Sequence, residues 1–378
     1  MSGTQAWGFT DDRGEQLGAV RVPRRVVAYV RVGAALYDLG VTPVAVYGSG
    51  HDGEVYDPAK AGVLEAVGVP YLGPGRALDE AVLRELRPDV VVDVTYDGKS
   101  PYALDEALVE RLGVPLVALS VGGELDLPSI LDRFAALAAD LRGAGPESAA
   151  PESAAPEAVG AEAVGPAAVD PVTTGPVTTS PVATGPTATD PAAAAVEPVA
   201  VEPVAVEPVA VEPAVVDGVT PVVVGASALG PEIVRPVTVS PAVGPGQGAA
   251  LAEFEAAEAA LREAAARTGL RVLALSGAGP EQVHLARPQA WPELAWLAGL
   301  GVRLLDPGPG PGANWLTTGW ERAAELRPDL VLFDDRDHAT PPYALPGGVR
   351  LASWNPETPP SPAAYARFFR DLAEALAP

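Results

Sequence analysis

Polar and aromatic side chains follow several apolar runs of the sequence, near the points where those runs end. In the first half of the chain they are Arg31, Tyr47, His51, Tyr96 and Lys99, and in the second half Arg287, Trp315, Arg336, His338 and Trp354. Arginine and lysine bind anionic or oxygen-rich groups, and aromatic faces pack on apolar groups. These residue types predict a site for a large ligand that has both oxygen-rich and apolar surfaces.

Several of these residues also have a purely structural interpretation. Trp315 and Trp354 can complete a hydrophobic core, because tryptophan is usually mostly buried. Arg336 can pair with the aspartates beside it in "DDRD", and Arg31 can be a surface residue. Tyr96, in a strand-end loop, is the best candidate for a ligand contact, and we expect Tyr96 and Arg336 to face each other across a cleft.

The three histidines suggest a second kind of chemistry. His51 lies in the first half of the chain, and His284 and His338 lie in the second, all near predicted strand ends. Together with Asp52 or Asp335, they could form a Zn- or Mn-type site when a cleft closes. Because no two of them have the close spacing of a ligand pair, direct metal binding is the alternative, and binding of a chelated metal is the main prediction.

The apolar runs alternate with amphipathic segments, which predicts a fold that positions these residues. Short runs rich in Val and Leu and flanked by breakers are typical of parallel strands buried on both faces. We predict strands at 24–30, 42–48, 89–96, 115–121, 270–277, 302–308, 328–335 and 348–354, and helices at 33–40, 78–87, 103–113, 126–143, 249–269, 292–301, 317–327 and 361–376. The predicted fold class is α/β, with two doubly wound parallel-sheet lobes and a ligand site at the carboxyl ends of the strands.

A proline-rich segment separates the two halves. Repeats such as "VEPVAVEPVAVEP" place proline every few residues and offer few large apolar groups, so we predict a disordered or polyproline-like spacer. An edge strand or a partner-binding role for the repeat is the alternative, and 215–239 is apolar enough to pack weakly. The predicted domains are 1–125, a bridging helix at 126–142, the low-complexity insertion at 143–247, and 248–378.

Composition excludes some classes of partner and chemistry. The chain of 378 residues has 49 Asp and Glu against 25 Lys and Arg, a net charge of −24, which argues against nucleic acid or an anionic membrane as partner. It has no cysteine, so disulfides, thiolate metal sites and cysteine nucleophiles are excluded. As written, the sequence shows no export signal and no apolar run of the ~18–20 residues that span a bilayer, which predicts a cytoplasmic protein without membrane insertion.

The order of segments resembles a known family. "FTDDRGEQLGAVRVPRRVVAYV", "ELRPDVVVDVTY" and "GVPLVALSVGG", followed by a long helix and a second α/β half, are similar to the substrate-binding proteins of iron-siderophore and vitamin B12 ABC importers. The resemblance covers roughly 8–142 and 249–377. It implies two lobes bridged by the helix at 126–142, with the ligand between them and the insertion in an outer turn.

The resemblance also implies a function. It implies non-catalytic binding of a ferric siderophore or similar metal chelate, by a monomer without a resident cofactor and with an ABC permease as partner. Members of the family are normally exported and often carry a lipid-modified cysteine, and the sequence shows neither feature.

An enzyme is the weaker alternative. The glycine-rich stretches "GSGHDGE" and "PGPGPG" form no dinucleotide fingerprint, P-loop or nucleophile elbow. Two doubly wound lobes also occur in glycosyltransferase-like enzymes, so that class remains the alternative to a binding protein, and we expect no catalysis.

Overall fold

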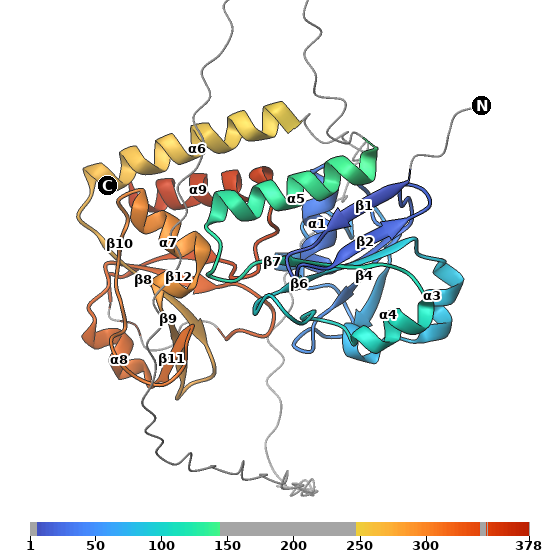
Figure 1. Ribbon diagram of the computed structural model, residues 1–378. Helices are drawn as coiled ribbons and strands as arrows, with labels where there is room; N and C mark the ends of the chain where they lie inside the picture. The colour runs from blue at the N-terminus through green and yellow to red at the C-terminus, as the bar shows by residue number, and fades with distance from the viewer. Residues whose placement is uncertain (1–5, 144–246, 341–344, 346, 378) are drawn as a thin grey trace, which may run out of the picture. The chain divides into compact units, whose positions relative to one another are not determined.

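The computed structural model describes residues 6–143, 247–340, 345 and 347–377 (Figure 1). The predicted spacer, apart from its end residues 143 and 247, lies outside the described residues, as does the segment 215–239. The described chain forms two α/β lobes, each built on its own sheet. The predicted fold class, with two parallel-sheet lobes, is thus confirmed.

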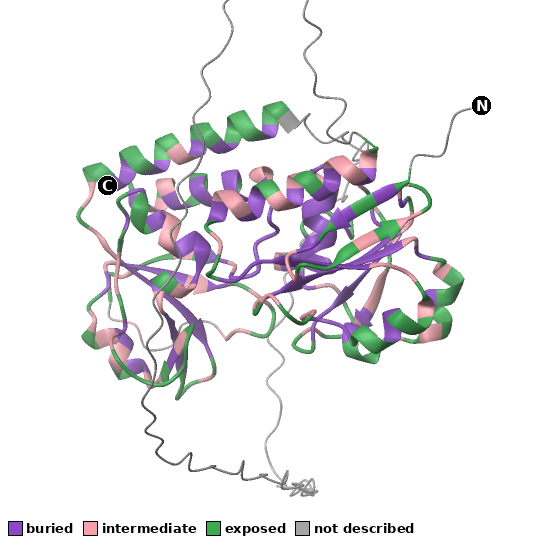
Figure 2. Cartoon of the chain, viewed as in Figure 1, coloured by how far each residue is buried: buried purple, intermediate pink, exposed green. Residues whose placement is uncertain are grey.

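The first lobe contains a five-stranded parallel sheet in the order β5-β4-β3-β6-β7. Its strands are β3 (Val26–Tyr29), β4 (Ala45–Gly48), β5 (Tyr71–Pro74), β6 (Val90–Thr95) and β7 (Leu116–Ser120). Every residue of β3, β4, β6 and β7 is buried, and Figure 2 shows this lobe's sheet largely in the colour of buried residues. Continuous apolar runs predicted this burial, because parallel strands are usually covered on both faces.

Aspartates cap three of the short helices of this lobe, α2, α3 and α4. The helices are α1 (Val30–Asp38), α2 (Pro58–Ala61), α3 (Glu80–Leu86) and α4 (Glu106–Leu112), with a 3-10 turn, η1 (Gly75–Ala77). The side chains of Asp57, Asp79 and Asp105 each accept a hydrogen bond from a backbone N–H of the first turn that follows. Such caps satisfy donors that an α-helix leaves free at its start.

Several elements of this lobe have no counterpart in the sequence prediction. They are β5, the short helix α2, the turn η1 and an antiparallel hairpin of β1 (Trp7–Thr10) and β2 (Gln16–Ala19). The hairpin is held to the lobe by Asp12, whose carboxylate accepts the N–H of Ser120 at 2.7 Å and the Arg133 Nε–H at 2.6 Å. These contacts join residues more than 100 positions apart, so local sequence could not indicate them.

The second lobe contains a six-stranded sheet in the order β11-β9-β8-β12-β13, with β10 beside β8. Its strands are β8 (Arg271–Gly277), β9 (Val283–Ala286), β10 (Arg303–Leu304), β11 (Trp315–Thr318), β12 (Leu330–Asp334) and β13 (Arg350–Trp354). Its helices are α7 (Pro292–Gly299), α8 (Trp320–Glu325) and the turn η3 (Pro288–Ala290).

The expectation of parallel strands holds for only part of this sheet. β8, β10, β12 and β13 are parallel, whereas β9 and β11 are antiparallel to their neighbours. The predicted helix at 317–327 is also wrong at its start, because Thr317 and Thr318 belong to β11 and α8 begins only at Trp320. The strands β9 and β11 have only four residues each. They form because they pair with neighbouring strands at one side of the sheet, which is a tertiary effect.

The motif Arg-Pro-Asp occurs at the same structural position in both lobes. Arg87 and Arg327 have φ of 46° and 51°, and they are the non-glycine residues with positive φ in the described chain. A left-handed residue ends a helix, and the following proline cannot continue it. Asp89 and Asp329 then accept backbone N–H groups from the residues that lead into β3 and from the first residue of β8. The motif fixes the amino ends of the strands, opposite the ends that carry the predicted site.

A single long helix, α5 (Leu127–Arg142), contributes to both cores. Asp126 caps it by accepting the Ser129 N–H at 2.9 Å. Its residues Ile130, Phe134, Leu137, Ala138 and Leu141 belong to the first lobe's core, whereas Leu127 and Leu131 belong to the second lobe's core. One helix that supplies side chains to two cores resists relative movement of the lobes, as expected of a bridging helix.

Helices α6 (Gln247–Arg267) and α9 (Pro362–Leu376) pack against each other, and Figure 1 shows them alongside α5. The Phe254 and Phe369 rings are 5.5 Å apart at this contact, and Figure 2 shows the outward side of α6 exposed. Within the described ranges, no helix combines the length and the apolar character needed to cross a lipid bilayer.

Candidate ligand-binding site

A cavity of about 580 Å³ lies where the carboxyl ends of strands from both lobes meet. It is lined by His51, Tyr96, Tyr102, Ser276, Gly277, Ala278, His284, Trp291, Asn314, Trp315, Thr317, Arg336, His338 and Glu357. The first three belong to the first lobe, in loops after β4 and β6, and the others to the second. A volume of this size is typical of sites for drug-sized ligands.

Tryptophans form one wall of the cavity. The Trp291 and Trp315 rings are 4.8 Å apart in an edge-to-face arrangement, and Trp354 lies 5.6 and 5.7 Å from them. Trp291 donates its indole N–H to the Asn314 carbonyl at 3.1 Å. Trp354 is buried behind the other two and donates to Glu293 Oε1 at 3.3 Å. The cluster offers a rigid apolar face whose orientation is fixed by hydrogen bonds behind it.

Tyrosines of the first lobe contribute a second aromatic surface. The Tyr96 and Tyr102 rings are 4.9 Å apart, and Tyr102 is 5.9 Å from Tyr29. The Tyr96 hydroxyl accepts a hydrogen bond from Arg31 Nη1 at 3.3 Å, and burial raises the pKa of Tyr96 well above its ordinary value. At neutral pH both cavity tyrosines therefore present neutral hydroxyl groups.

Under the cavity, a buried ionic network joins the two lobes. Lys60 Nζ lies 2.6 Å from Asp52 Oδ1 and 2.5 Å from Glu357 Oε2, and all three side chains are almost completely buried. Glu357 also accepts the Tyr29 hydroxyl at 2.9 Å. Arg336 Nη1 lies 3.3 Å from Glu357 Oε2, the oxygen that also contacts Lys60. Glu357 thus links two residues of the first lobe with one of its own.

The charges of this network set the pKa of its members. Burial alone raises the pKa of the Glu357 carboxyl, but Lys60 and Arg336 outweigh burial and hold that pKa at about 2. Burial lowers the pKa of Lys60, and its two carboxylate partners raise it by more, so the net shift is upward. Glu357 and Lys60 are consequently both ionised over the physiological range.

The loop after β13 contributes further bonds between the lobes. Arg31 Nε donates to the Thr358 carbonyl at 3.0 Å, and the Asn355 side-chain amide donates to the Ala59 carbonyl. The residues from 356 to 360 are buried although the sequence there reads "PETPP". This loop seats the second lobe on the first, and Glu357 is its charged member.

The histidines do not form a metal site within the described residues, where no group of three His, Cys, Asp or Glu side chains is placed to hold an ion. The His51 and His338 rings are 6.0 Å apart, and His284 Nδ1 lies 2.9 Å from Thr317 Oγ1. Burial lowers the pKa of His284 and His338 below the ordinary value of 6.5. Both are therefore neutral at pH 7 and offer hydrogen-bonding nitrogens to the cavity.

Five of the ten predicted site residues line the cavity. They are His51, Tyr96, Trp315, Arg336 and His338. Tyr96 lies on the first lobe and Arg336 on the second, as expected for residues on two sides of a cleft. The local pairing of Arg336 is also present, since its guanidinium donates to both Asp334 oxygens, at 2.9 and 2.7 Å.

The other five predicted residues lie elsewhere, and for them the structure corrects the prediction. Tyr47 is in the first lobe's core, where its hydroxyl donates to the Val92 carbonyl, and Trp354 is in the second lobe's core. Arg31 is 3% exposed and bonds the lobes together. Lys99 is exposed in a turn.

Arg287 is the clearest of these corrections. Its guanidinium donates to the carbonyls of Gly308, Gly310 and Gly312 at 2.6, 2.9 and 3.0 Å. The predicted ligand contact is thus a structural residue that organises the "PGPGPG" loop. Because glycine has no side chain that could block access, one arginine can reach the carbonyl groups of all three residues.

Sequence reasoning missed Tyr102, Trp291, Asn314 and Glu357 among the cavity residues, and Lys60 beneath it. The fully buried lysine is the least predictable, because lysine is rarely buried without a partner. Its partner Glu357 lies almost 300 residues away in the sequence. The local signals were weak: Lys60 lies in the one-turn helix α2, two residues after Pro58, and Glu357 directly follows Pro356 in the loop after β13.

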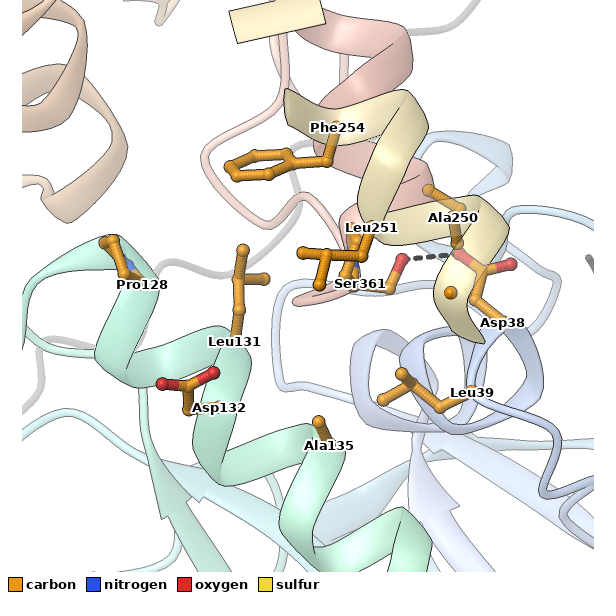
Figure 3. Close-up of a pocket in the computed structure, with 13 residues that line it drawn as sticks. Asp38, Leu39, Pro128, Leu131, Asp132, Ala135, Ala250, Leu251, Phe254 and Ser361 are labelled. Atoms are coloured by element: carbon orange, nitrogen blue, oxygen red, sulfur yellow. Dashed lines mark hydrogen bonds between the residues drawn. The ribbon is translucent and has the colours of Figure 1, made fainter. Parts of the chain in front are cut away.

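A second cavity of about 330 Å³ lies among α1, α5, α6 and α9 (Figure 3). Its lining is mostly apolar and includes Leu39, Leu131 and Phe254. At one side, Ser361 Oγ donates to Asp38 Oδ2 at 2.5 Å, the hydrogen bond drawn in Figure 3. This cavity is built by helices and lacks the aromatic and polar groups of the strand-end site, so we assign the predicted site to the larger cavity.

Comparison with known proteins shows the fold. The sequence matches no family model and no curated protein. Among solved structures, it is similar to DesE, a ferric-siderophore receptor protein from Streptomyces coelicolor, with 21% identity and a TM-score of 0.62 over 98% of this chain and 97% of that one. It is also similar to the heme-binding protein HmuT, with 13% identity and a TM-score of 0.52 over 100% of this chain and 92% of that one.

A periplasmic solute-binding protein from Mycobacterium smegmatis is a third neighbour, with 13% identity and a TM-score of 0.50 over 98% of this chain and 97% of that one. At such identities the likeness shows the fold, not the ligand. The chain shares the two-lobe fold of these solute-binding proteins, and its segment order predicted a two-lobe fold.

Proposed function

We propose that this protein binds a ferric siderophore or a similar metal chelate in the cavity between its lobes, without chemically changing it. The observation that carries the proposal is the cavity itself: about 580 Å³, at the carboxyl ends of both sheets, with tryptophans on one side and tyrosines on the other. Aromatic faces suit the apolar arms of a chelate, and hydroxyl, imidazole and amide groups suit its oxygen-rich face.

The fold supports this proposal over an enzyme or a bare metal site. DesE, which shares the fold, is described as a ferric-siderophore receptor. Within the described chain, the histidines and carboxylates do not converge on an ion site. We further propose that the protein is a monomer that delivers its ligand to an ABC permease. Cell fractionation and mass mapping of the mature N-terminus test where it does so.

Heme is a second candidate, because three histidines and two tyrosines line the cavity and such side chains can ligate heme iron. A shift of the heme absorption band on mixing would support it. A spectrum equal to that of free heme would exclude heme, and the ferric chelate would remain the proposed ligand.

Calorimetric titration of the full chain with a panel of ferric chelates tests the proposal. Trp315→Ala is expected to weaken binding by roughly 10- to 100-fold, the range for losing a buried aromatic contact. Trp296→Ala, a half-buried tryptophan of α7 that does not line the cavity, is the matched control and should bind like the wild type. Absence of binding to every chelate, or equal losses in both variants, would refute the proposal. The bound chelate should be recovered unchanged by mass spectrometry.

A further inference from the structure

The positive charges next to the cavity are already paired with protein carboxylates. Arg336, the one permanently charged cation among the described residues that line it, donates two hydrogen bonds to Asp334 and lies 3.3 Å from Glu357. Its guanidinium is thus held on two sides by negative groups of the protein. An anionic ligand would have to compete with these carboxylates for the same donors.

The two cations behind the cavity wall are also unavailable. Lys60 is 0% exposed and lies within 2.6 Å of Asp52 and 2.5 Å of Glu357. Arg31 donates to the Thr358 carbonyl and to the Tyr96 hydroxyl, and the charges of Glu357 and Glu293 act on it. Both side chains are almost completely buried, and neither lines the cavity.

The charges near the cavity therefore sum to zero or less. Arg31, Lys60 and Arg336 supply three positive charges, and Asp52, Asp334 and Glu357 supply three negative charges. Glu293 adds negative charge when it ionises; its pKa is raised to about 7, chiefly by burial. An anion that leaves water for such a cavity loses its hydration and gains no fixed counter-charge, which is costly.

We infer that the cavity selects chelates by charge and accepts a neutral or cationic ferric chelate, such as a ferric tris-hydroxamate, over a trianionic ferric tris-catecholate. The inference rests on the proposed function and narrows its substrate class. A pendant ammonium on the chelate would find the faces of Trp291 and Trp315, which attract cations. The two carboxylates of a heme would meet the same lack of free cations as a catecholate.

The test is a pair of calorimetric titrations of the full chain at neutral pH, with a monocationic ferric tris-hydroxamate and with a ferric tris-catecholate. We expect the tris-hydroxamate to bind at least roughly 100-fold more tightly, about 2.7 kcal/mol. Tris-catecholate binding as tight or tighter would overturn the charge inference and leave the proposed function standing. Binding of neither chelate would overturn the proposed function as well.

A charge-neutralising variant tests the cause. Glu357→Gln removes one of the two carboxylates that hold Lys60 and Arg336, so affinity for the tris-catecholate should rise at least roughly tenfold relative to the tris-hydroxamate. A purely structural loss would weaken both chelates equally and would refute the assignment. If Glu357→Gln does not fold, Asp334→Asn, which removes the two-bond partner of Arg336, should shift the ratio in the same direction. Glu85→Gln, an exposed residue of α3, should leave the ratio unchanged.

Discussion

Glu357→Gln should also destabilise the fold, by an amount that the structure allows us to estimate. The Glu357 side chain is 3% exposed and touches Lys60, Arg336 and Tyr29. Its pKa is held at about 2 against an ordinary value of 4.5. At about 1.36 kcal/mol per pH unit, the ionised carboxylate stabilises the folded state by about 3 kcal/mol. Breaking a buried ion pair from one side costs a similar ~3–5 kcal/mol, because the remaining charge stays buried.

The lowered pKa of Glu357 determines whether the stabilisation rises or falls with pH. The folded pKa of Glu357 is lower than the unfolded value, so the folded state binds fewer protons. The stabilisation is fully present above pH ~4.5 and is lost as the pH falls toward ~2. The difference in unfolding free energy between wild type and Glu357→Gln should therefore be about 3 kcal/mol at neutral pH and should shrink in acid.

Urea denaturation at a series of pH values measures this difference. Glu85→Gln, the same chemical change at an exposed position of α3, is the control and should stay within about 0.5 kcal/mol of the wild type at every pH. The reasoning fails if Glu357→Gln is as stable as the control at neutral pH. It also fails if the loss in the variant is the same at pH ~3 as at pH ~7.

Three further predictions concern other parts of the chain. Glu293 has a folded pKa raised to about 7, above its ordinary 4.5, so stability should fall as pH rises through this window. Glu293→Gln should consequently gain about 1–3 kcal/mol at pH ~8 and little at pH ~5 in urea denaturation; a loss at pH ~8 would contradict this. Arg287→Lys cannot reach all three glycine carbonyls of the loop, so it should cost about 1–3 kcal/mol and expose residues 308–312 to limited proteolysis; an uncleaved loop of wild-type stability would count against the assigned role. Replacing 146–246 by a short Gly-Ser linker should leave the melting temperature nearly unchanged by calorimetry, whereas a large drop would show that the insertion belongs to the core.

Local sequence was sufficient for the elements that depend on neighbours along the chain. Buried parallel strands such as β6 follow from continuous runs of Val, and α5 follows from the Asp126 cap and an apolar stripe. The positions just after β6 and β12 were predicted for the same reason, since a strand that ends in polar residues places them at the carboxyl edge of its sheet. Tyr96, Arg336 and His338, which were predicted in this way, line the cavity.

The direction of a side chain was harder to predict where a strand is buried on both faces. Tyr47 is the last residue but one of β4, which is buried throughout, and no alternation of polar and apolar residues shows whether it turns toward the cavity. Trp354 ends β13, whose other residues are exposed or half-buried, and it packs into the second lobe's core. The structure places both in a core. Arg287 was hard to predict for another reason. Its sequence context suggested a ligand contact, but it binds glycine carbonyls more than 20 positions away in the sequence.

The charge balance of the site was decided largely by tertiary structure. The sequence offered Arg31, Lys99, Arg287 and Arg336 as cations for an anionic ligand. Spacing indicated the Asp334 partner of Arg336, but not its second partner Glu357, nor the carbonyl groups that Arg31 and Arg287 bind. Lys60 and Glu357, separated by almost 300 residues, meet only because the loop after β13 packs on the first lobe. A buried charge is costly unless an opposite charge lies beside it, so Lys60 and Glu357 must pair once they are buried. Whether a charge is buried depends on how the whole chain packs.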